Sequence, residues 1–260
     1  MASTANKKNQ RSVRKTLLDG DVAFQVTEAY KNLRTNLTFA LSTKPSKVFV
    51  VSSALTSEGK STVAANISIT MAEADMKTLL IDCDLRKPVQ HKVFKVTNEK
   101  GLSTLLGGIH SFKEVVHKNI TDNLDLITCG TIPPNPSELL ASDKMKTLLE
   151  ELSKYYDYII LDTPPINIVT DALTLIDSTA GFLLAARYDQ STYDSLGDAI
   201  EAIKMAEGSI LGVVITNVSV SKGKYGGRYN YRYRYKYRYK YDYSYTYGAS
   251  NQKDEDDEQE

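Results

Sequence analysis

The chain has 260 residues and a formal net charge of zero, a length that suits one large α/β domain or two small ones. No apolar run approaches the roughly 18 residues of a membrane span and the N-terminus lacks the apolar core of a secretory signal, so we expect a cytoplasmic protein. Cys83, Cys129 and the three histidines have no metal-ligand spacing, and we expect them to be ordinary structural residues.

The composition of the two ends limits the folded part of the chain. The first two dozen residues and everything after Ser221 lack regularly spaced apolar residues, so only about 200 central residues can build a core. We therefore expect a flexible N-terminal segment over 1–24, one domain over 25–220 and a disordered tyrosine-rich tail over 221–260.

The first expected element is an amphipathic helix over residues 26–41, where apolar residues recur at three- and four-residue spacing. Its polar side holds Glu28, Lys31 and Arg34. At about 100° per residue these three fall within about a third of the circumference and form one charged stripe. The ordinary interpretation of such a stripe is a solvated face.

Short, continuously apolar runs follow, which is typical of strands buried on both faces. The expected strands cover 48–53, 78–83, 124–128, 158–162, 181–186 and 210–216. Helical patterns over 61–74, 136–154 and 191–206 supply the crossover connections that a parallel sheet requires. We expect a three-layer α/β sandwich with a mostly parallel sheet, whose ligands lie beyond the carboxyl ends of the strands.

A phosphate-binding loop, SSALTSEGKST, follows the first expected strand and opens a helix. It matches the P-loop pattern except that alanine replaces the first glycine, and such a loop wraps its N–H groups around phosphates while its Lys reaches the outer phosphates and its Ser ligates Mg²⁺. The pattern therefore predicts a P-loop NTPase fold that binds ATP and Mg²⁺. The expected nucleotide-binding residues are Ala54, Ser57, Glu58, Gly59, Lys60, Ser61, Thr62 and, from the next loop, Arg86.

Carboxylates end two further strands. Asp82 and Asp84 lie two residues apart in LLIDCDLRKP, and Asp162 ends YIILDTPP. Three acids beside Lys60 would repel one another unless a cation lay among them. We expect all four to be catalytic, with Asp82 as the base and Ser61, Asp84 and Asp162 as Mg²⁺ ligands.

Eleven of the seventeen tyrosines lie near the C-terminus. Nine alternate strictly with other residues, and eight Lys or Arg but no acid lie between Ser221 and Tyr241. The tyrosines are Tyr225, Tyr229, Tyr231, Tyr233, Tyr235, Tyr237, Tyr239, Tyr241, Tyr243, Tyr245 and Tyr247. The run could be an edge strand, an arm for nucleic acid or anionic membrane, or a substrate.

A kinase-like site on the same chain favours the substrate interpretation, and we expect no nucleic-acid partner. A basic arm is attracted to carboxylates and ATP phosphates. Each added phosphate brings about −1.5 to −2 charges, so roughly four or five would cancel the eight basic residues. We expect a graded switch, in which the unmodified tail docks on acidic sites and the modified tail is repelled.

Together these motifs resemble the bacterial tyrosine kinases of capsular and extracellular polysaccharide machinery, in the form whose membrane activator is a separate chain. The resemblance covers most of the chain and includes EAYKNLRTN, GLSTLLGG and IPPNPSELLAS. It implies that Glu28 and Arg34 belong to a charged motif used for ring-shaped oligomers, with Lys31 in place of the usual middle arginine. Lysine cannot form the bidentate fork of arginine, which weakens the expected ring.

The resemblance further implies phosphorylation of the tail tyrosines in trans within the ring, a membrane-embedded polysaccharide co-polymerase activator, a tyrosine phosphatase partner and control of polysaccharide synthesis or export. One alternative is a partitioning ATPase, whose loop carries an extra lysine where this chain has Leu55. The other is an ATP-binding scaffold with an anion-binding tail. Asn217, at the end of the last expected strand, is a weak candidate for an adenine contact.

Overall fold

The computed structural model describes residues 16–20 and 22–218. Within these ranges one sheet has the strand order β3-β4-β2-β5-β1-β6-β7, and only β3 and β4 pair antiparallel. This confirms the mostly parallel sheet. The strands are β1 (Val48–Ser53), β2 (Thr78–Asp82), β3 (Val116–Thr121), β4 (Leu124–Ile127), β5 (Tyr158–Asp162), β6 (Phe182–Arg187) and β7 (Ile210–Thr216).

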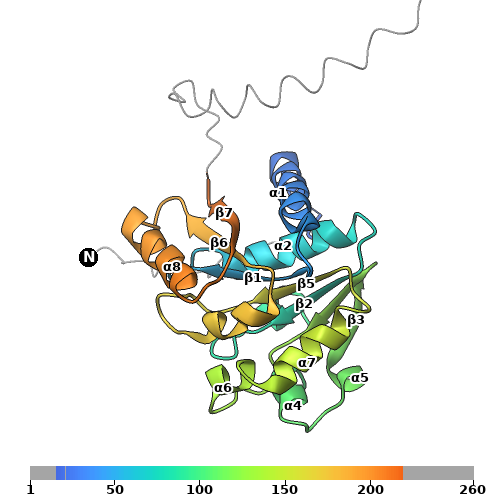
Figure 1. Ribbon diagram of the computed structural model, residues 1–260. Helices are drawn as coiled ribbons and strands as arrows, with labels where there is room; N and C mark the ends of the chain where they lie inside the picture. The colour runs from blue at the N-terminus through green and yellow to red at the C-terminus, as the bar shows by residue number, and fades with distance from the viewer. Residues whose placement is uncertain (1–15, 21, 219–260) are drawn as a thin grey trace, which may run out of the picture. The chain divides into compact units, whose positions relative to one another are not determined.

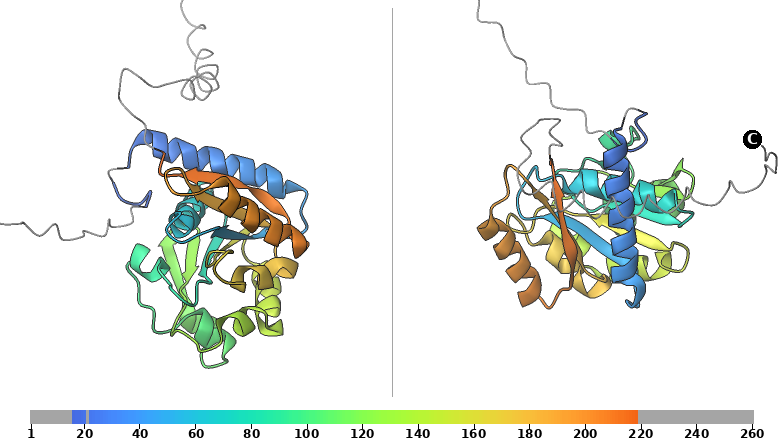
Figure 2. Two further views of the ribbon diagram at one scale, coloured as in Figure 1. Left: turned by 90° about the vertical axis from the view of Figure 1, so that its left-hand side faces the viewer. Right: turned by 90° about the horizontal axis from the view of Figure 1, so that it is seen from above.

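Helices cover both faces of the sheet, so the expected three-layer sandwich is confirmed (Figures 1 and 2). One face carries α1 (Phe24–Ser42) and α2 (Lys60–Ala72). The other carries α4 (Leu102–Leu106), α6 (Pro136–Leu140), α7 (Asp143–Leu152), the 3₁₀ helix η1 (Asp171–Ser178) and α8 (Tyr193–Met205). The short helices α3 (Gln90–Val93) and α5 (Phe112–Val115) lie between β2 and β3 in the chain.

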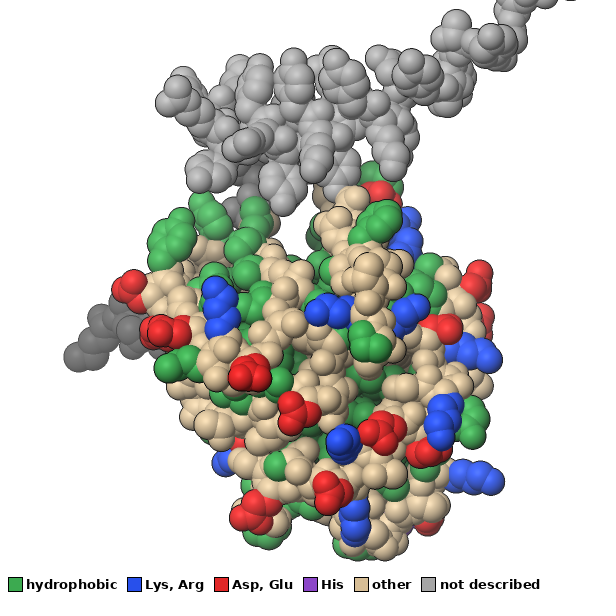
Figure 3. Space-filling model, in the orientation of Figure 1, with side chains coloured by type: hydrophobic (Ala, Val, Ile, Leu, Met, Phe, Trp, Pro, Cys, Tyr) green, Lys and Arg blue, Asp and Glu red, His purple; other side chains and the backbone are tan. Residues whose placement is uncertain are grey.

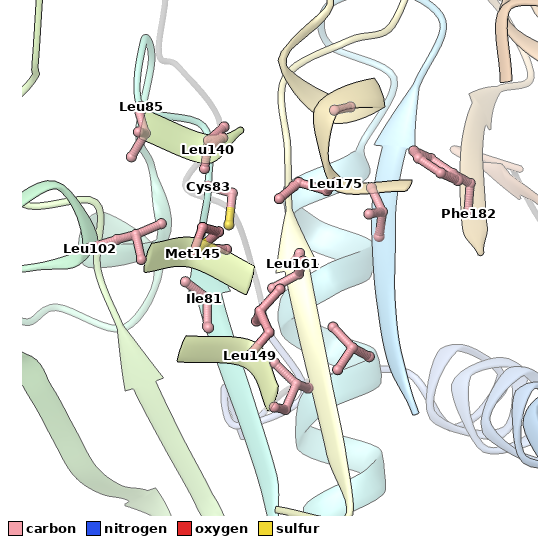
Figure 4. Close-up of a cluster of buried hydrophobic side chains, with 14 of the residues drawn as sticks. Ile81, Cys83, Leu85, Leu102, Leu140, Met145, Leu149, Leu161, Leu175 and Phe182 are labelled. Carbon is pink, nitrogen blue, oxygen red and sulfur yellow. The ribbon is translucent and has the colours of Figure 1, made fainter. Parts of the chain in front are cut away.

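Each central strand contributes to two hydrophobic cores. On β1, Val48 and Val50 face the side of α6, α7 and α8, whereas Phe49 and Val51 face α1 and α2. All four side chains are buried. Figure 4 shows the first of these cores, where side chains from α6 and α7 pack over β2 and β5. Burial on both faces explains why these strands form continuous apolar runs in the sequence.

The prediction of a helix over 136–154 is wrong in one respect, because the structure has two helices there, α6 and α7. Ser142 lies between the two helices with a ψ of 150°, and its Oγ accepts a hydrogen bond from the Met145 N–H at 3.3 Å. Serine is favoured at this capping position because its side chain satisfies an N–H that lacks a helical partner. A new helix therefore begins where a single one was expected.

The apolar patterns in the sequence did not predict β3. This strand pairs antiparallel with β4 at the edge of the sheet, and its register is irregular between His117 and Thr121. Its sequence, VHKNIT, is largely polar and its side chains are half-buried or exposed. A strand at the edge needs no continuous apolar run, so it lacks the pattern that predicted the others.

The first described residues pack on the domain. Leu17 lies against α2, because its N–H donates to Asn66 Oδ1 at 2.8 Å and its side chain packs on the core beneath α1 and α2. Among the described residues no helix is both long and apolar enough to cross a membrane. The tyrosine-rich tail expected over 221–260 lies outside the described residues.

Candidate active site

The strand order brings the predicted site residues together. The phosphate-binding loop follows β1, and β5 and β2 are the next two strands on one side of it. Asp82 and Asp162 end β2 and β5 and are direct partners in the parallel register. Because parallel strands end at the same edge, the loop and the acids share one site at the carboxyl edge of the sheet.

The loop has its shape because of a left-handed residue before α2. Gly59 has φ of 95°, and a Cβ at this position would lie 3.2 Å from two side-chain atoms of Thr216 at the end of β7. The Thr216 hydroxyl also donates to the Glu58 carbonyl oxygen at 2.7 Å. Glycine is required here both by the backbone conformation and by the close approach of β7.

The side chain of Glu58 stabilises the phosphate-binding loop through hydrogen bonds. Its side chain is buried, Oε2 accepts a hydrogen bond from the Leu55 N–H at 2.7 Å, and Oε1 accepts one from the Ser191 hydroxyl. The segment after β6 adds a second contact, since Gln190 Nε2 donates to the Thr56 carbonyl at 2.9 Å. The Glu58 side chain thus links the loop to the segment that follows β6.

Lys60 reaches into a group of acids. Its Nζ lies 2.8 Å from Asp84 Oδ2 and 3.6 Å from Asp162 Oδ1, and it also donates to Ser61 Oγ at 3.3 Å. Burial alone would lower the pKa of Lys60, but the charges of Asp162 and Asp84 raise it above its usual value. The lysine is therefore a largely buried cation, with its side chain 11% exposed, already positioned beside the carboxylates.

The two oxygens of Asp162 have different surroundings. Oδ2 accepts a hydrogen bond from Gln90 Nε2 at 2.7 Å, whereas the buried Oδ1 has no hydrogen-bond partner among the described residues. Burial raises the pKa of this carboxyl group, and the charge of Lys60 opposes that shift. A buried oxygen without a donor, beside the Ser61 hydroxyl and Asp84, fits a Mg²⁺ ligand set of oxygens.

Asp82 is also fully buried, and its two oxygens differ. Oδ2 accepts hydrogen bonds from the N–H groups of Val89 and Gln90 at 3.0 and 2.9 Å, while Oδ1 receives only the Asp84 N–H at 3.3 Å. Burial and the charge of Asp162 raise the pKa of Asp82 to about 7, against the opposing effect of the Gln90 N–H. A carboxyl group with such a pKa can exchange a proton near neutral pH.

Gln90 is the residue at this site that sequence reasoning missed. It is fully buried, it begins α3, and besides Asp162 it donates to the Ser61 carbonyl oxygen at 3.0 Å. No motif contains it, and a glutamine eight residues beyond the strand-end acid Asp82 gives no chemical signal of its own. Only the fold places it between Ser61, Asp82 and Asp162.

Arg86 has a partner other than phosphate in this structure. Its guanidinium makes two hydrogen bonds to the Asp171 carboxylate, at 2.8 and 2.9 Å, and a third to Ser137 Oγ at 3.1 Å. Burial would raise the pKa of Asp171, but the bonds from Arg86 and Ser137 lower it below its usual value. This group ties the loop after β2 to α6 and η1, and phosphate binding by Arg86 stays a prediction.

The remaining loop residues take ordinary positions. Ala54 is buried in the core next to the loop, Ser57 is exposed with φ of 67°, and Thr62 is half-buried on α2. Asn217, with φ of 57°, donates to Asp189 Oδ1 at 3.0 Å at the exposed end of β7. Whether any of these contacts nucleotide stays a prediction.

The charged stripe of α1 is divided between two roles. Lys31 Nζ pairs with Glu28 Oε1 at 3.0 Å within the stripe. Arg34 instead donates from NH1 to the Thr70 carbonyl oxygen at 2.6 Å, near the end of α2. The tail tyrosines expected to accept phosphate lie outside the described residues.

A groove of about 770 Å³ lies at the other end of the sheet, away from Lys60. Lys47, Lys146 and Asp177 are among its lining residues, next to the amino ends of β1 and β5. On the face drawn in Figure 3, acidic and basic side chains are interspersed. This face contrasts with the buried acids Asp82, Asp84 and Asp162, which lie together beside the phosphate-binding loop.

The fold and this site define a P-loop nucleotide-binding domain. In agreement, a family model described as an AAA domain matches residues 46–207, from just before β1 to just after α8.

Comparison with known proteins narrows the class. Tyrosine-protein kinase YwqD of Bacillus subtilis is 38% identical over 208 residues, which cover 78% of this chain and 88% of that protein. The kinase domain of Escherichia coli tyrosine kinase ETK superposes with a TM-score of 0.71 at 33% identity, over 83% of this chain and 94% of that domain. The chimerical protein CapA2B2 matches with a TM-score of 0.70 at 36% identity, over 72% and 83% of the two chains. The chain belongs to the bacterial tyrosine-protein kinases.

Proposed function

We propose that this protein transfers the γ-phosphoryl group of ATP to tyrosine side chains, with the tyrosines at 225–247 of its own tail as main acceptors. The observation that carries the proposal is the largely buried Lys60 ammonium of the P-loop, which lies between Asp84 and Asp162. Membership of the tyrosine-kinase family supports tyrosine as the acceptor. The eleven tail tyrosines supply acceptors on the same chain.

ATP and Mg²⁺ fit the residues present. Ser61, Asp84 and Asp162 would hold the ion, because they offer a hydroxyl and two carboxylates, and Asp162 Oδ1 is buried without a donor among the described residues. When bound, Mg²⁺ supplies neutralisation of phosphate charge. Lys60 contacts Asp84 at 2.8 Å, so it must share or exchange this partner to reach a phosphate.

Asp82 is our proposed base. As the tyrosine oxygen forms its bond to the γ-phosphorus, the bridging bond to ADP breaks and the phenolic proton passes to Asp82 Oδ1, the oxygen with only one long hydrogen bond. Since Asp82 is fully buried, the loop between β2 and α3 must open locally for the hydroxyl to reach it. Asp84, which pairs with Lys60, is then left to ligate the ion.

The assembly and setting of the kinase are part of the same proposal. Phosphorylation in trans within a homo-oligomeric ring requires the α1 stripe to contact a neighbouring subunit. A membrane-embedded polysaccharide co-polymerase would recruit the kinase to the cytoplasmic face of the membrane and activate it, and a tyrosine phosphatase would reverse the modification. The resemblance to kinases of polysaccharide machinery and the match to chimerical CapA2B2 support this arrangement.

The test is tyrosine phosphorylation of the purified chain with ATP and Mg²⁺, with and without the cytoplasmic segment of the activator. Lys60→Met and a chain ending at Ser221 are each expected to abolish the signal. Lys154→Met is the matched control, because this lysine is exposed and pairs with Glu151 on the surface. ATP hydrolysis without labelled tyrosine would favour a partitioning-type ATPase. Unchanged binding of an anionic polymer by a Lys60→Met chain, without labelling in the wild type, would favour a scaffold.

A second experiment separates the two adjacent acids. Asp82→Asn is expected to retain Mg²⁺-dependent binding of a fluorescent ADP analogue and to lose phosphoryl transfer about 100-fold or more, the range of general-base catalysis. Asp84→Asn is expected to weaken the Mg²⁺ dependence of binding itself. The reverse pattern would exchange the roles that we assign to these residues.

A further inference from the structure

Gln90 connects three parts of the site. Its side-chain nitrogen donates to Asp162 Oδ2 at 2.7 Å and to the Ser61 carbonyl oxygen at 3.0 Å. Its backbone N–H donates to Asp82 Oδ2 at 2.9 Å. One residue at the start of α3 thus contacts the end of β5, the first turn of α2 and the end of β2.

The orientation of the Gln90 amide is set by its neighbours. An amide nitrogen has two donors, and the two groups that it faces, a carboxylate and a carbonyl, are both acceptors. With the amide turned over, its oxygen would face two acceptors and both bonds would be lost. The contacts with Asp162 and Ser61 therefore define a single orientation.

Simple packing accounts poorly for this side chain. Gln90 is completely buried, yet its Oε1 has no hydrogen-bond partner among the described residues. An apolar residue of the same size would anchor α3 without leaving a buried acceptor unsatisfied, which is costly. The amide is better explained by the bonds that its two donors make to Asp162 and to the Ser61 carbonyl.

The bond from Gln90 distinguishes the two Asp162 oxygens. Oδ2 accepts the Gln90 hydrogen bond, whereas Oδ1 has no hydrogen-bond partner among the described residues and pairs with Lys60 Nζ at 3.6 Å. The bond from Gln90 to the Ser61 carbonyl fixes the same carboxylate relative to the helix that carries Lys60 and Ser61. A partner that orients a metal-binding carboxylate in this way strongly affects metal affinity.

We propose that Gln90 is a positioning residue for phosphoryl transfer, which holds Asp162 in the orientation that binds the Mg²⁺ of the nucleotide complex. The inference rests on the proposed function for the assignment of Asp162 as a Mg²⁺ ligand. It adds a residue outside the P-loop and the strand-end acids to the groups on which activity depends.

The test is Gln90→Met, which preserves size and removes both side-chain donors while the backbone bond to Asp82 remains. Binding of a fluorescent ADP analogue is titrated with Mg²⁺ and also measured in EDTA. The Mg²⁺ concentration for half-maximal effect is expected to rise about 10- to 100-fold, the usual effect of losing such a partner. Affinity in EDTA is expected to stay within about twofold, because the side-chain bond of Gln90 to the loop goes to the Ser61 carbonyl oxygen, an acceptor that offers phosphate no hydrogen bond.

Two further variants make the result decisive. Gln90→Glu keeps the shape, removes the donors and places an oxygen against Asp162, so it is expected to shift the Mg²⁺ requirement at least as far as Gln90→Met. Asn66→Leu removes another buried amide on α2, one that binds Leu17 rather than the site, and is expected to leave the requirement unchanged.

An unshifted Mg²⁺ requirement in a folded Gln90→Met or Gln90→Glu protein would overturn the proposal. Equal losses of affinity with Mg²⁺ and in EDTA would also overturn it, because they would indicate general disruption of the loop. A wild-type chain that phosphorylates no tyrosine, together with a raised Mg²⁺ requirement in the Gln90 variants, would refute the proposed function. The positioning role of Gln90 in Mg²⁺ binding would then still hold.

Discussion

At the residue scale, the phosphate-binding loop depends on Gly59. This residue has φ of 95°, a conformation that costs an L-residue with a Cβ about 1–2 kcal/mol. A Cβ would also press on Thr216 at 3.2 Å, in the strand that supports the loop. The backbone and the neighbouring strand therefore impose the same requirement.

We predict that Gly59→Ala lowers the free energy of unfolding by about 1–2 kcal/mol or more and weakens nucleotide binding. Urea denaturation and titration with a fluorescent nucleotide measure the two effects. Gly197→Ala is the control, because nothing lies within 4 Å of the added Cβ in the interior of α8. This control is expected to stabilise the protein by about 0.5–1 kcal/mol, and an equal effect of both substitutions would contradict the argument.

Asp171 provides a pH prediction at the same scale. Its pKa is lower in the folded protein than in the unfolded chain, where it is about 3.9, because Arg86 and Ser137 stabilise the carboxylate. The stabilisation is present above the unfolded pKa and is lost as the pH falls through the folded pKa. We expect the difference in unfolding free energy between wild type and Asp171→Asn to be constant from pH 7 to 5 and to shrink below pH 4. A free-energy difference that grows towards low pH would contradict a lowered pKa of Asp171 in the folded protein.

At the element scale, α1 packs on the domain and also exposes charged side chains to solvent. Arg34 donates to the carbonyl of Thr70 on α2, so this arginine contributes to packing within the protomer. The Lys31 and Glu28 side chains are 45% and 30% exposed and pair only with each other among the described residues. These two are consequently better placed than Arg34 to contact another subunit.

We predict different outcomes for substitutions along this stripe. Glu28→Lys is expected to reduce the proposed oligomer without changing the unfolding free energy of the protomer by more than about 0.5 kcal/mol. Arg34→Ala is expected to lower protomer stability as well, by about 1–2 kcal/mol, because it removes a charged hydrogen bond. Lys31→Arg is expected to strengthen assembly by supplying a bidentate fork. Light scattering after gel filtration and urea denaturation measure these effects, and assembly that is insensitive to all three would place the interface elsewhere.

At the scale of the whole molecule, nucleotide binding is expected to stabilise the folded domain. A ligand present at 100 times its Kd and bound only to the folded state adds about 2.7 kcal/mol to the unfolding free energy. We predict that ADP with Mg²⁺ raises the melting temperature and that EDTA removes much of this gain.

Deletion of the tail after Ser221 should leave this stabilisation unchanged, since the described residues of both hydrophobic cores precede Ser221. Scanning calorimetry of the full and shortened chains measures both effects. A lower melting temperature of the shortened chain without nucleotide would show that the tail contributes to folding.

Much of the fold could be predicted because buried parallel strands carry a local signal. The runs 48–53 and 158–162 coincide with β1 and β5, in which every residue is buried, since burial on both faces favours apolar residues along the whole strand. The run 210–216 also coincides with β7, but β7 lies at an edge of the sheet and its residues are half-buried or exposed, so burial on both faces does not explain that run. The edge strand β3 lacks such a run. The break at Ser142 depends on whether a local cap prevails over continued helix, which apolar spacing does not report.

The sequence by itself determined the phosphate-binding loop and the strand-end acids Asp82, Asp84 and Asp162, because each of these motifs is a contiguous segment whose chemistry follows from its residue types. Tertiary structure alone decided which side chains complete the site. Gln90 meets Asp162 from 72 positions away, and Arg86 meets Asp171 from 85. Glu58 meets Ser191 from 133. Contacts over such separations arise from the order in which strands enter the sheet, and that order depends on packing throughout the domain and leaves no local pattern in the chain.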